Sequence, residues 1–347
     1  MKKTKYLTAA LAVLGILVVM GCAGLQGQTT ARSASGVDFV MNTWVEQRWY
    51  GKNAQRTYDE ILSALKELEH KLSLYEEGSE ISRLNSAAGL HPVALSHETY
   101  QLLRKAADYS ARSDGLFDIT IAPLTLAWDV TAEHPRIPPA AEIQAAQALV
   151  DYRKIVFDDA GETVMLADAG MRIDLGGIAK GMAAALMRQY PVKNNVQGYL
   201  SIGGNMMVQG KKPDGKDFVI GVRDPRGDAS EYIASLSLDG LTMATTGDYE
   251  RYFEQDGVRY HHIIDPFTGY PADTDLISVT VVAEDGTLAD YLSTLIFMRG
   301  RAALSDYLER DDCMVLAVTG DLEVVASKPL WARLTVNTQK DVYKFNA

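Results

Sequence analysis

The sequence is poor in cysteine and has no excess of basic residues. Its two cysteines, Cys22 and Cys313, are too few for a disulfide framework or a cysteine-rich metal site. The 34 Lys and Arg residues are outnumbered by 45 Asp and Glu residues, and the net charge is −11. Because no block of basic residues interrupts this acidic balance, we expect no nucleic-acid partner. A bound metal would need oxygen or imidazole ligands.

The composition also excludes disordered and fibrous classes of protein. The chain has 347 residues, of which 47% are hydrophobic and 23% are charged, and this length suits one large domain or two modest ones. No internal repeat and no linker rich in proline, glycine or serine divides residues 37–347. We therefore expect a single folded unit over this range.

The N-terminal segment is typical of an export signal. Three lysines in the first five residues precede an uncharged stretch, 6–20, which is too short for a comfortable membrane span. The stretch leads into Val19-Met-Gly-Cys22, which resembles the lipobox of bacterial lipoproteins. We predict a signal peptide over 1–21, a lipid on Cys22 and a flexible tether over 22–36. The protein is then expected in a bacterial cell envelope, lipid-anchored to a membrane and facing the periplasm or exterior; the alternative is an uncleaved anchor.

The pattern of apolar residues predicts helices early in the chain and strands late. Apolar residues at three-and-four spacing predict a helix over 58–72, and further helices are expected over 96–110 and 140–149. From about residue 150 onward, short apolar or alternating runs predict strands, including a hairpin around Asp256-Gly257 and a buried strand position for Cys313. This order indicates an α+β fold rather than a regular βαβ alternation.

A glycine-rich turn at 173–181 is the first candidate site. Its sequence, Ile-Asp-Leu-Gly-Gly-Ile-Ala-Lys-Gly, runs from a short strand through a diglycine into a helix. Backbone amides at such a turn can approach an anion, and Lys180 adds positive charge at the helix N-terminus. The spacing matches neither a Walker loop nor a dinucleotide fingerprint, so an ordinary turn with a solvated lysine remains an alternative.

The other candidate clusters are ambiguous from the residues alone. Asp290 and Thr294 lie one helical turn apart and offer hard oxygen ligands for Mg²⁺, although the spacing favours a capping box with Thr287 as N-cap. His262 suits either a general base or a structural hydrogen bond at the end of the hairpin. Residues 114–118 and Tyr75 supply aromatic and carboxylate groups suited to a heterocycle and a sugar, or else belong to the core.

In their order along the chain, these motifs resemble the ApbE family of flavin transferases (FAD:protein FMN transferases) from bacterial envelopes. The resemblance spans nearly the whole chain after the tether. It rests on Met41-Asn-Thr43, Leu72-Ser-Leu-Tyr75, Ser79-Glu-Ile-Ser-Arg-Leu-Asn85, Gly115-Leu-Phe-Asp118, residues 173–181, Ser201-Ile-Gly-Gly-Asn205, Thr246-Gly-Asp-Tyr-Glu-Arg-Tyr-Phe253, His262-Ile-Ile-Asp-Pro266 and Ala289-Asp290.

The resemblance implies a T-fold-like α+β core of antiparallel sheets with packed helices. It also implies Mg²⁺-dependent transfer of FMN from FAD to a threonine or serine hydroxyl of a partner protein, with a membrane-attached redox subunit as the expected acceptor. His262 would activate the acceptor hydroxyl, and Asp290 would be a metal ligand rather than a cap. The implied FAD contacts are Met41, Tyr75, Leu116, Phe117, Asp118, Asp174, Lys180 and Ile264, and the implied Mg²⁺ ligands are the Gly177 carbonyl, Asp290 and Thr294.

Two positions depart from the family pattern. Asn42 stands where the family commonly has glycine, and Ser293 stands where some members carry a second aspartate. We expect neither change to remove a group that the reaction needs. The alternatives are a Mg²⁺-dependent FAD pyrophosphatase that gives FMN and AMP, and a flavin-binding lipoprotein without turnover. The presence of Asp290 and Thr294 argues against the second alternative.

Overall fold

The computed structural model describes residues 32–337 and 341–346. The predicted signal peptide, Cys22 and most of the predicted tether lie outside these residues. The predicted end of the tether at residue 36 is wrong, because β1 (Ser33–Val40) pairs with β2 (Thr43–Tyr50) along its whole length. Within the described ranges, the search for a helix that could cross a membrane finds none of sufficient length and hydropathy.

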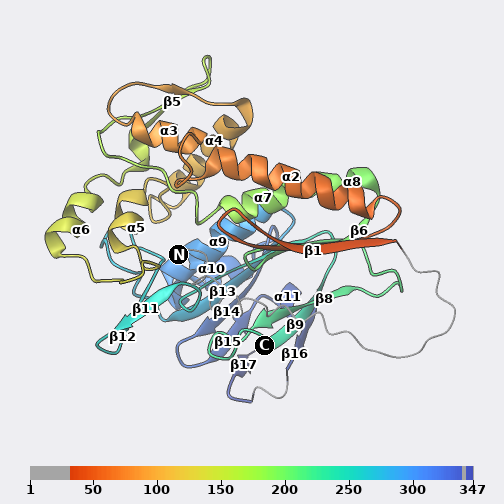
Figure 1. Cartoon of the computed structure of the whole chain (residues 1–347). Helices are drawn as coiled ribbons and strands as arrows, with labels where there is room; N and C mark the ends of the chain where they lie inside the picture. Colours follow the sequence, from red (N-terminus) through yellow and green to blue (C-terminus); the bar gives the residue numbers. More distant parts are fainter. Residues whose placement is uncertain (1–31, 338–340, 347) are drawn as a thin grey trace.

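A nine-stranded sheet forms the centre of the structure (Figure 1). Its strands in spatial order are β1, β2, β6 (Gln197–Ile202), β7 (Asn205–Gln209), β10 (Thr242–Gly247), β13 (Leu276–Ala283), β14 (Met314–Thr319), β15 (Glu323–Ala326) and β17 (Lys344–Asn346). Neighbouring strands are antiparallel except for β15 and β17. The expected α+β class is confirmed.

Three smaller sheets and a set of helices surround this central sheet. The smaller sheets are β16 (Leu334–Val336), β9 (Tyr232–Leu238) and β8 (Phe218–Arg223); β3 (Val93–Ala94), β5 (Thr163–Leu166) and β4 (Ile155–Asp158); and the hairpin of β11 (Tyr252–Gln255) and β12 (Val258–His261). The α-helices are α2 (Ala54–Leu72), α3 (Glu80–Ser86), α4 (His97–Arg112), α5 (Ala122–Trp128), α6 (Ala140–Gln147), α7 (Ala179–Met187), α8 (Gln189–Asn194), α9 (Gly286–Arg299), α10 (Ser305–Leu308) and α11 (Lys328–Trp331).

The two faces of the central sheet contribute to two different cores. Along β7, Met207 belongs to the larger core with residues of α2, α4, α7 and α9, whereas Met206 and Val208 belong to a second core with β8 and β9. This division follows from the alternation of side chains along a strand. The sheet therefore lies between a helical layer and a second sheet, and its helical face carries α7 and α9.

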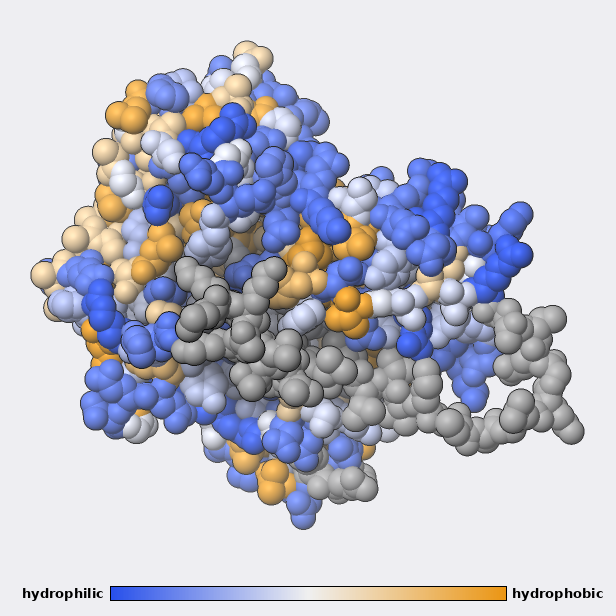
Figure 2. Space-filling model, viewed as in Figure 1, coloured by the Kyte–Doolittle hydropathy of each residue, from blue (hydrophilic) through white to orange (hydrophobic). Residues whose placement is uncertain are grey.

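Several elements agree with the sequence-based expectations. The helix predicted over 58–72 is α2, the helices predicted over 96–110 and 140–149 are α4 and α6, and the hairpin turns at Asp256-Gly257. Cys313 is buried directly before β14. Helices α5 and α6 form a lobe beside the β11–β12 hairpin, with its own small core and with hydrophobic residues on its surface at the left of Figure 2.

Candidate functional site

Helices α7 and α9 approach closely at a pair of glycines, and this contact joins two of the predicted site segments. A Cβ atom on Gly181 would collide with the carbonyl oxygen of Gly286 and would lie 2.5 Å from the Cβ of Asp290. Only glycine fits such an approach between two backbones. The contact places the Asp290 side chain against the first turn of α7.

Asp290 is buried and takes the place of a backbone acceptor in α7. Its Oδ2 accepts a hydrogen bond of 2.8 Å from the Gly181 N–H, and the residue is 3% exposed. In a regular helix this N–H would donate to the carbonyl oxygen of Gly177. Because it donates to Asp290 instead, the Gly177 carbonyl oxygen accepts no helical hydrogen bond from Gly181. Across the described part of the chain, Asp290 Oδ1 accepts no hydrogen bond from protein, so one carboxylate oxygen and one carbonyl oxygen are available to a ligand.

Hydroxyl groups from α9 and β10 complete this polar cluster. The Oγ1 of Thr294 lies 3.1 Å from Thr246 Oγ1 and donates to the Asp290 carbonyl oxygen over 3.3 Å. Ser293 is fully buried, and its hydroxyl donates to the same carbonyl oxygen and pairs with Thr246 at 2.8 Å. The Ser293 hydroxyl is therefore used in hydrogen bonds to Thr246 and to the Asp290 carbonyl oxygen, and it is not a free ligand oxygen.

The N-cap of α9 differs from the one that spacing alone favoured. Asp285 is the N-cap, and its carboxylate accepts a hydrogen bond of 2.9 Å from the Thr287 N–H. Thr287 consequently lies inside the first turn, and the interpretation of Thr287 and Asp290 as a capping box is wrong. The Asp290 carboxylate is committed to α7 instead.

Two cations, Lys180 and Arg251, lie near His262 and have no carboxylate partner among the described residues. The Lys180 Nζ lies 3.4 Å from the Gly176 carbonyl oxygen, and its Cδ would lie 3.2 Å from a Cβ on Gly203. The positive charges of Arg251 and Lys180 both act on the imidazole of His262. Residues from α7, the β10–β11 loop and the segment after β12 therefore share one site.

The geometry of His262 defines its tautomer. Its backbone N–H and its ring Nδ1 both lie within hydrogen-bond distance of the Arg251 carbonyl oxygen, at 3.0 and 3.2 Å. A carbonyl oxygen only accepts, so Nδ1 carries the proton and Nε2 of the neutral ring presents a lone pair. Burial by the surrounding protein, and then the charges of Arg251 and Lys180, lower the pKa of His262 far below its ordinary value. His262 is half-buried, and its ring is neutral at pH 7.

His262 and its neighbour His261 make the stability of the protein depend on pH. Burial lowers the pKa of both His261 and His262 in the folded protein, whereas in the unfolded chain they bind protons near pH 6.5. The unfolded chain therefore binds more protons below this pH, and acid favours unfolding. We expect each histidine to lower the free energy of unfolding by up to about 2 kcal/mol between pH 7.5 and pH 5. Urea unfolding at the two pH values should show a smaller loss for His262→Gln than for wild type; equal losses would contradict this expectation.

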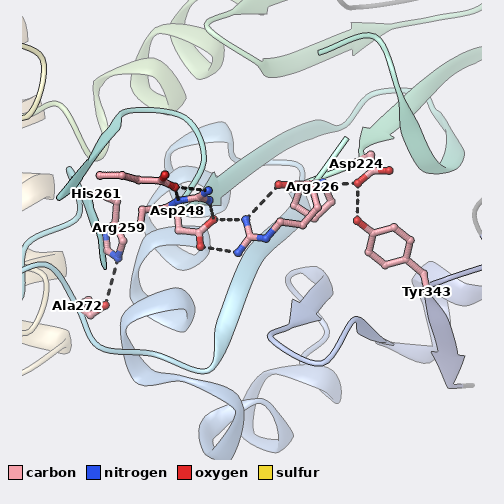
Figure 3. A network of polar contacts seen from close by, with 9 residues as sticks. Asp224, Arg226, Asp248, Arg259, His261, Ala272 and Tyr343 are labelled. Atoms are coloured by element: carbon pink, nitrogen blue, oxygen red, sulfur yellow. Dashed lines mark hydrogen bonds and ion pairs between the residues drawn. The ribbon is translucent and has the colours of Figure 1, made fainter. Parts of the chain in front are cut away.

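An ionic network fixes the loop that carries Arg251 (Figure 3). The guanidinium of Arg226 binds both carboxylate oxygens of Asp248 at 2.7 Å, and Arg259 lies 3.5 Å from the same carboxylate. Asp248 precedes Arg251 by three residues. The network therefore joins the β8–β9 connection to the start of the loop and to β12, which leads into His262.

Tyr75 presents an exposed ring beside the same site. The ring, 71% exposed, follows α2, and surrounding protein together with the carboxylate of Asp174 raises the pKa of Tyr75 while the Arg251 charge opposes the rise. Asp174 accepts hydrogen bonds from the Gly176 N–H at 2.7 Å and from the Thr125 hydroxyl at 3.1 Å. An exposed ring close to a cation is suited to stacking on a flat heterocycle.

The turn between β1 and β2 also reaches the site. Its two central residues, Met41 and Asn42, both have left-handed backbone angles, with φ of 57° and 54°, as a type I′ hairpin turn requires. Asparagine adopts this conformation readily, so the departure from glycine at Asn42 preserves the turn. The turn lies close to Lys180, because a Cβ on Gly203 would meet both Thr43 and the lysine. Met41 is strained there, as residues at functional sites often are.

Two of the predicted FAD contacts have side chains that face the protein interior. Burial raises the pKa of Asp118, and its oxygens accept hydrogen bonds from the N–H and hydroxyl of Thr120 and from the Tyr152 N–H, at 2.7 to 2.9 Å. The side chain of Ile264 belongs to the small core of α5 and α6. A ligand at these two positions would meet backbone atoms.

The neighbouring residues Leu116 and Phe117 pack beside the start of α7. Phe117 is buried, contacts the ring of Tyr291 edge-on at 5.2 Å, and lies 3.1 Å from the position that a Cβ on Gly177 would take. Leu116 is half-buried against the main core. The 116–118 segment thus supports the turn at Gly177.

Two cavities among the described residues can be compared with the predicted site. One, of about 240 Å³, is lined by Asp114, Gly115, Asp118, Val150, Asp151, Tyr152, Arg153, Pro266 and Phe267. The other, of about 340 Å³, is lined by Asp217, Ser237, Leu238, Asp239, Ala332 and Arg333, none of which is a predicted site residue. The smaller cavity therefore adjoins the predicted site, and the larger does not.

The comparisons with known proteins agree with this arrangement. The profile of the ApbE family matches residues 41–317. The chain belongs to the ApbE family. An ApbE-family relative from Klebsiella pneumoniae, an FAD:protein FMN transferase, is 36% identical over 79% of this chain and 87% of its own. One of the same name from Treponema pallidum is 33% identical over 83% of this chain and 85% of its own.

Solved ApbE structures have the same fold. An ApbE protein from Thermotoga maritima superposes with a TM-score of 0.79 at 36% identity, over 87% of this chain and 99% of that chain. The flavin transferase ApbE from Vibrio cholerae superposes with a TM-score of 0.77 at 26% identity, over the same shares. The sequence did not predict Thr246 and Arg251 as site residues. Both lie in the 246–253 motif on which the family resemblance partly rests.

Proposed function

We propose that this protein is an FAD:protein FMN transferase, which moves FMN from FAD to a threonine or serine hydroxyl of a partner protein and releases AMP. The observation that carries the proposal is that two cations without a carboxylate partner in the described chain converge on His262: Lys180 in the first turn of α7, next to the α7–α9 contact, and Arg251. Such a pair is suited to a pyrophosphate. The exposed ring of Tyr75 is suited to the flavin, and the names of the relatives support the same activity.

The oxygen atoms at the helix contact fit a Mg²⁺ ion. In the described residues, no three His, Cys, Asp or Glu side chains gather to hold a metal, so we propose a site built from the Asp290 carboxylate, the Thr294 hydroxyl and the Gly177 carbonyl oxygen. Mg²⁺ accepts one carboxylate with neutral oxygens, and water and substrate phosphate fill the other positions. When bound, the ion would stabilise negative charge on the pyrophosphate.

The protein side chains would then divide the remaining chemistry. The acceptor oxygen attacks the phosphorus of the FMN half, the bond from this phosphorus to the AMP oxygen breaks, and the hydroxyl proton passes to Nε2 of His262. Lys180 and Arg251 would neutralise the charge that develops on the phosphates. The charge of a bound pyrophosphate would also raise the pKa of His262 toward a useful range.

The flavin and its phosphates would be held by residues from five segments. We propose side-chain contacts from Met41, Tyr75 and Lys180. At Leu116, Phe117, Asp118 and Ile264 we propose backbone contacts, because these side chains pack or hydrogen-bond within the protein. Asp174 would contact the ligand from the turn that it shares with Gly176.

The cellular setting is part of the proposal. We propose that Cys22 carries a lipid that anchors the enzyme in a bacterial envelope, with a membrane-attached redox subunit as acceptor. An anchor would raise the effective concentration of enzyme at the membrane where this acceptor resides. Mass spectrometry of the N-terminal peptide from membranes would test the lipid directly, and an unmodified Cys22 would contradict it.

The transfer itself is tested with the full chain in detergent. FAD, Mg²⁺ and candidate threonine-bearing acceptor domains are added, and the products are read by in-gel flavin fluorescence and intact mass. A fluorescent acceptor with one added FMN supports the transferase. Free FMN and AMP without any labelled acceptor would favour the pyrophosphatase, and bound FAD without turnover would favour a flavin-binding protein.

The role of His262 leads to a separate prediction. We expect His262→Gln to slow transfer by about 10²-fold to 10⁴-fold, the range for loss of a general base. The Kd for FAD should change less than about threefold, because glutamine is polar and similar in size. Single-turnover transfer and FAD titration measure the two effects. His70→Gln on the exposed surface of α2 serves as the control. A transfer rate within threefold of wild type would remove His262 from the mechanism.

A further inference from the structure

Asn205, the first residue of β7, carries a buried amide without a hydrogen-bond partner. The residue is 1% exposed, and its Nδ2 has no acceptor within the described structure. Buried amide donors are nearly always paired, because an unpaired donor destabilises the folded state. An orphaned donor next to a binding site therefore points to an acceptor that arrives with the ligand.

The direction of the side chain follows from the strand. Met207, two residues further on, belongs to the core that β7 shares with α7 and α9, whereas Met206 belongs to the core on the other face. Side chains at alternate positions lie on the same face of a sheet. The amide of Asn205 therefore faces α7 and α9, the helices that carry Lys180 and Asp290.

The neighbours of Asn205 on both sides belong to the candidate site. Strand β7 pairs with β10 through Met207 and Thr242 and through Met206 and Met243. Continued by one position, this antiparallel register places Asn205 opposite Ala244, and Thr246 lies two residues further along β10 on the same face. Thr246 in turn contacts Thr294. On the other side, the turn that precedes Asn205 packs on the side chain of Lys180.

We propose that Asn205 is a substrate-binding residue whose Nδ2 donates a hydrogen bond to a pyrophosphate oxygen of bound FAD. This inference rests on the proposed function. Asn205 follows the turn that approaches Lys180, and it lies on the same face of the sheet as Thr246, which contacts Thr294. A phosphate group bound there would be close to a cation and to the proposed Asp290 site. A phosphate oxygen is a charged acceptor, and a hydrogen bond to it is stronger than one between neutral groups.

The test uses Asn205→Leu in the full chain, because leucine has a similar volume and no polar atoms. We expect the Kd for FAD and for ADP, which retains the pyrophosphate, to rise about tenfold. The Kd for riboflavin, which has no phosphate, should be unchanged. The Tm without ligand should stay the same or rise, since an unpaired buried amide has been removed. Calorimetric titration and thermal unfolding give these values.

Two further variants separate binding from structure. Asn205→Asp keeps the shape but places a carboxylate near the phosphates, and we expect an even larger loss of FAD affinity that shrinks at high salt. Asn194→Leu is the matched control, because Asn194 Nδ2 is buried and donates to Thr57 and Glu60. This control should lower the Tm without ligand and leave the Kd for FAD unchanged.

The outcomes distinguish this inference from the proposed function. Unchanged FAD affinity in both Asn205 variants, or equal losses for FAD and riboflavin, would overturn the assignment while the transferase stands. A lower Tm in Asn205→Leu with unaffected FAD binding would make the residue structural and would overturn it too. A wild-type chain that binds no FAD would overturn the proposed function, and this inference with it.

Discussion

Asp290→Asn is expected to lower flavin transfer by at least about 10³-fold in a protein that remains folded. The carboxylate is the one acidic group that the α7–α9 contact offers to a metal, and a bound metal ion contributes several kcal/mol to stabilising charge on a transferring phosphoryl group. Asparagine keeps the shape, and its carbonyl oxygen can still accept the hydrogen bond from the Gly181 N–H. The loss should therefore fall on chemistry rather than on helix packing.

The measurement is transfer to an acceptor domain over a range of Mg²⁺ concentrations, with thermal unfolding of the same samples. Asp285→Asn is the matched control, since Asp285 caps the same helix and pairs with Lys105 on the surface. Asparagine is also a good N-cap, so this control should transfer flavin at close to the wild-type rate. Transfer by Asp290→Asn above a tenth of the wild-type rate at any Mg²⁺ concentration would remove Asp290 from the metal site.

Much of the fold was predictable because the patterns are local. The spacing of apolar residues in α2 and the Asp-Gly turn of the β11–β12 hairpin depend on neighbours within a few positions. The end of the tether was not predictable in this way. Gly36 looks like part of a linker, but β1 packs on α2 there, and a Cβ on Gly36 would collide with the hydroxyl of Tyr58. A small residue that packing requires has the same composition as a flexible one.

The candidate site shows the same limit more sharply. The spacing of Thr287 and Asp290 fits a capping box, but the partner of Asp290 is Gly181, 109 residues earlier in the chain. No local pattern contains that contact, and the family resemblance indicated only that Asp290 had another role. Motif matches at Asp118 and Ile264 likewise identified positions near the site. They could not show that both side chains turn inward.

The family departures are also explained by structure rather than by sequence. Asn42 adopts the left-handed backbone that glycine would otherwise provide in the β1–β2 turn. The Ser293 hydroxyl forms hydrogen bonds with Thr246 and with the Asp290 carbonyl oxygen. Ser293 therefore stabilises the site without adding a charge. Asn42 therefore preserves the position of the adjacent Met41, and Ser293 preserves that of Asp290, one helical turn earlier in α9. The proposed reaction uses both Met41 and Asp290.

Gly181→Ala is expected to reduce transfer below detection and to lower the free energy of unfolding by about 1–3 kcal/mol, the usual range for overpacking a close contact. The added methyl group would collide with the Gly286 carbonyl oxygen and with the Cβ of Asp290, and backbone atoms cannot turn aside as a flexible side chain would. Helices α7 and α9 must separate, and the Gly177 carbonyl, Lys180 and Asp290 would lose their common position.

Urea unfolding and transfer to an acceptor domain should show the two effects of Gly181→Ala together, because one contact holds the helices and builds the site. Gly320→Ala is the control: this glycine is exposed, and a Cβ there would meet its nearest neighbour at 3.7 Å. It should be as stable and as active as wild type. If Gly181→Ala loses stability but transfers flavin normally, the close approach of α7 and α9 serves only packing, and the site does not depend on it.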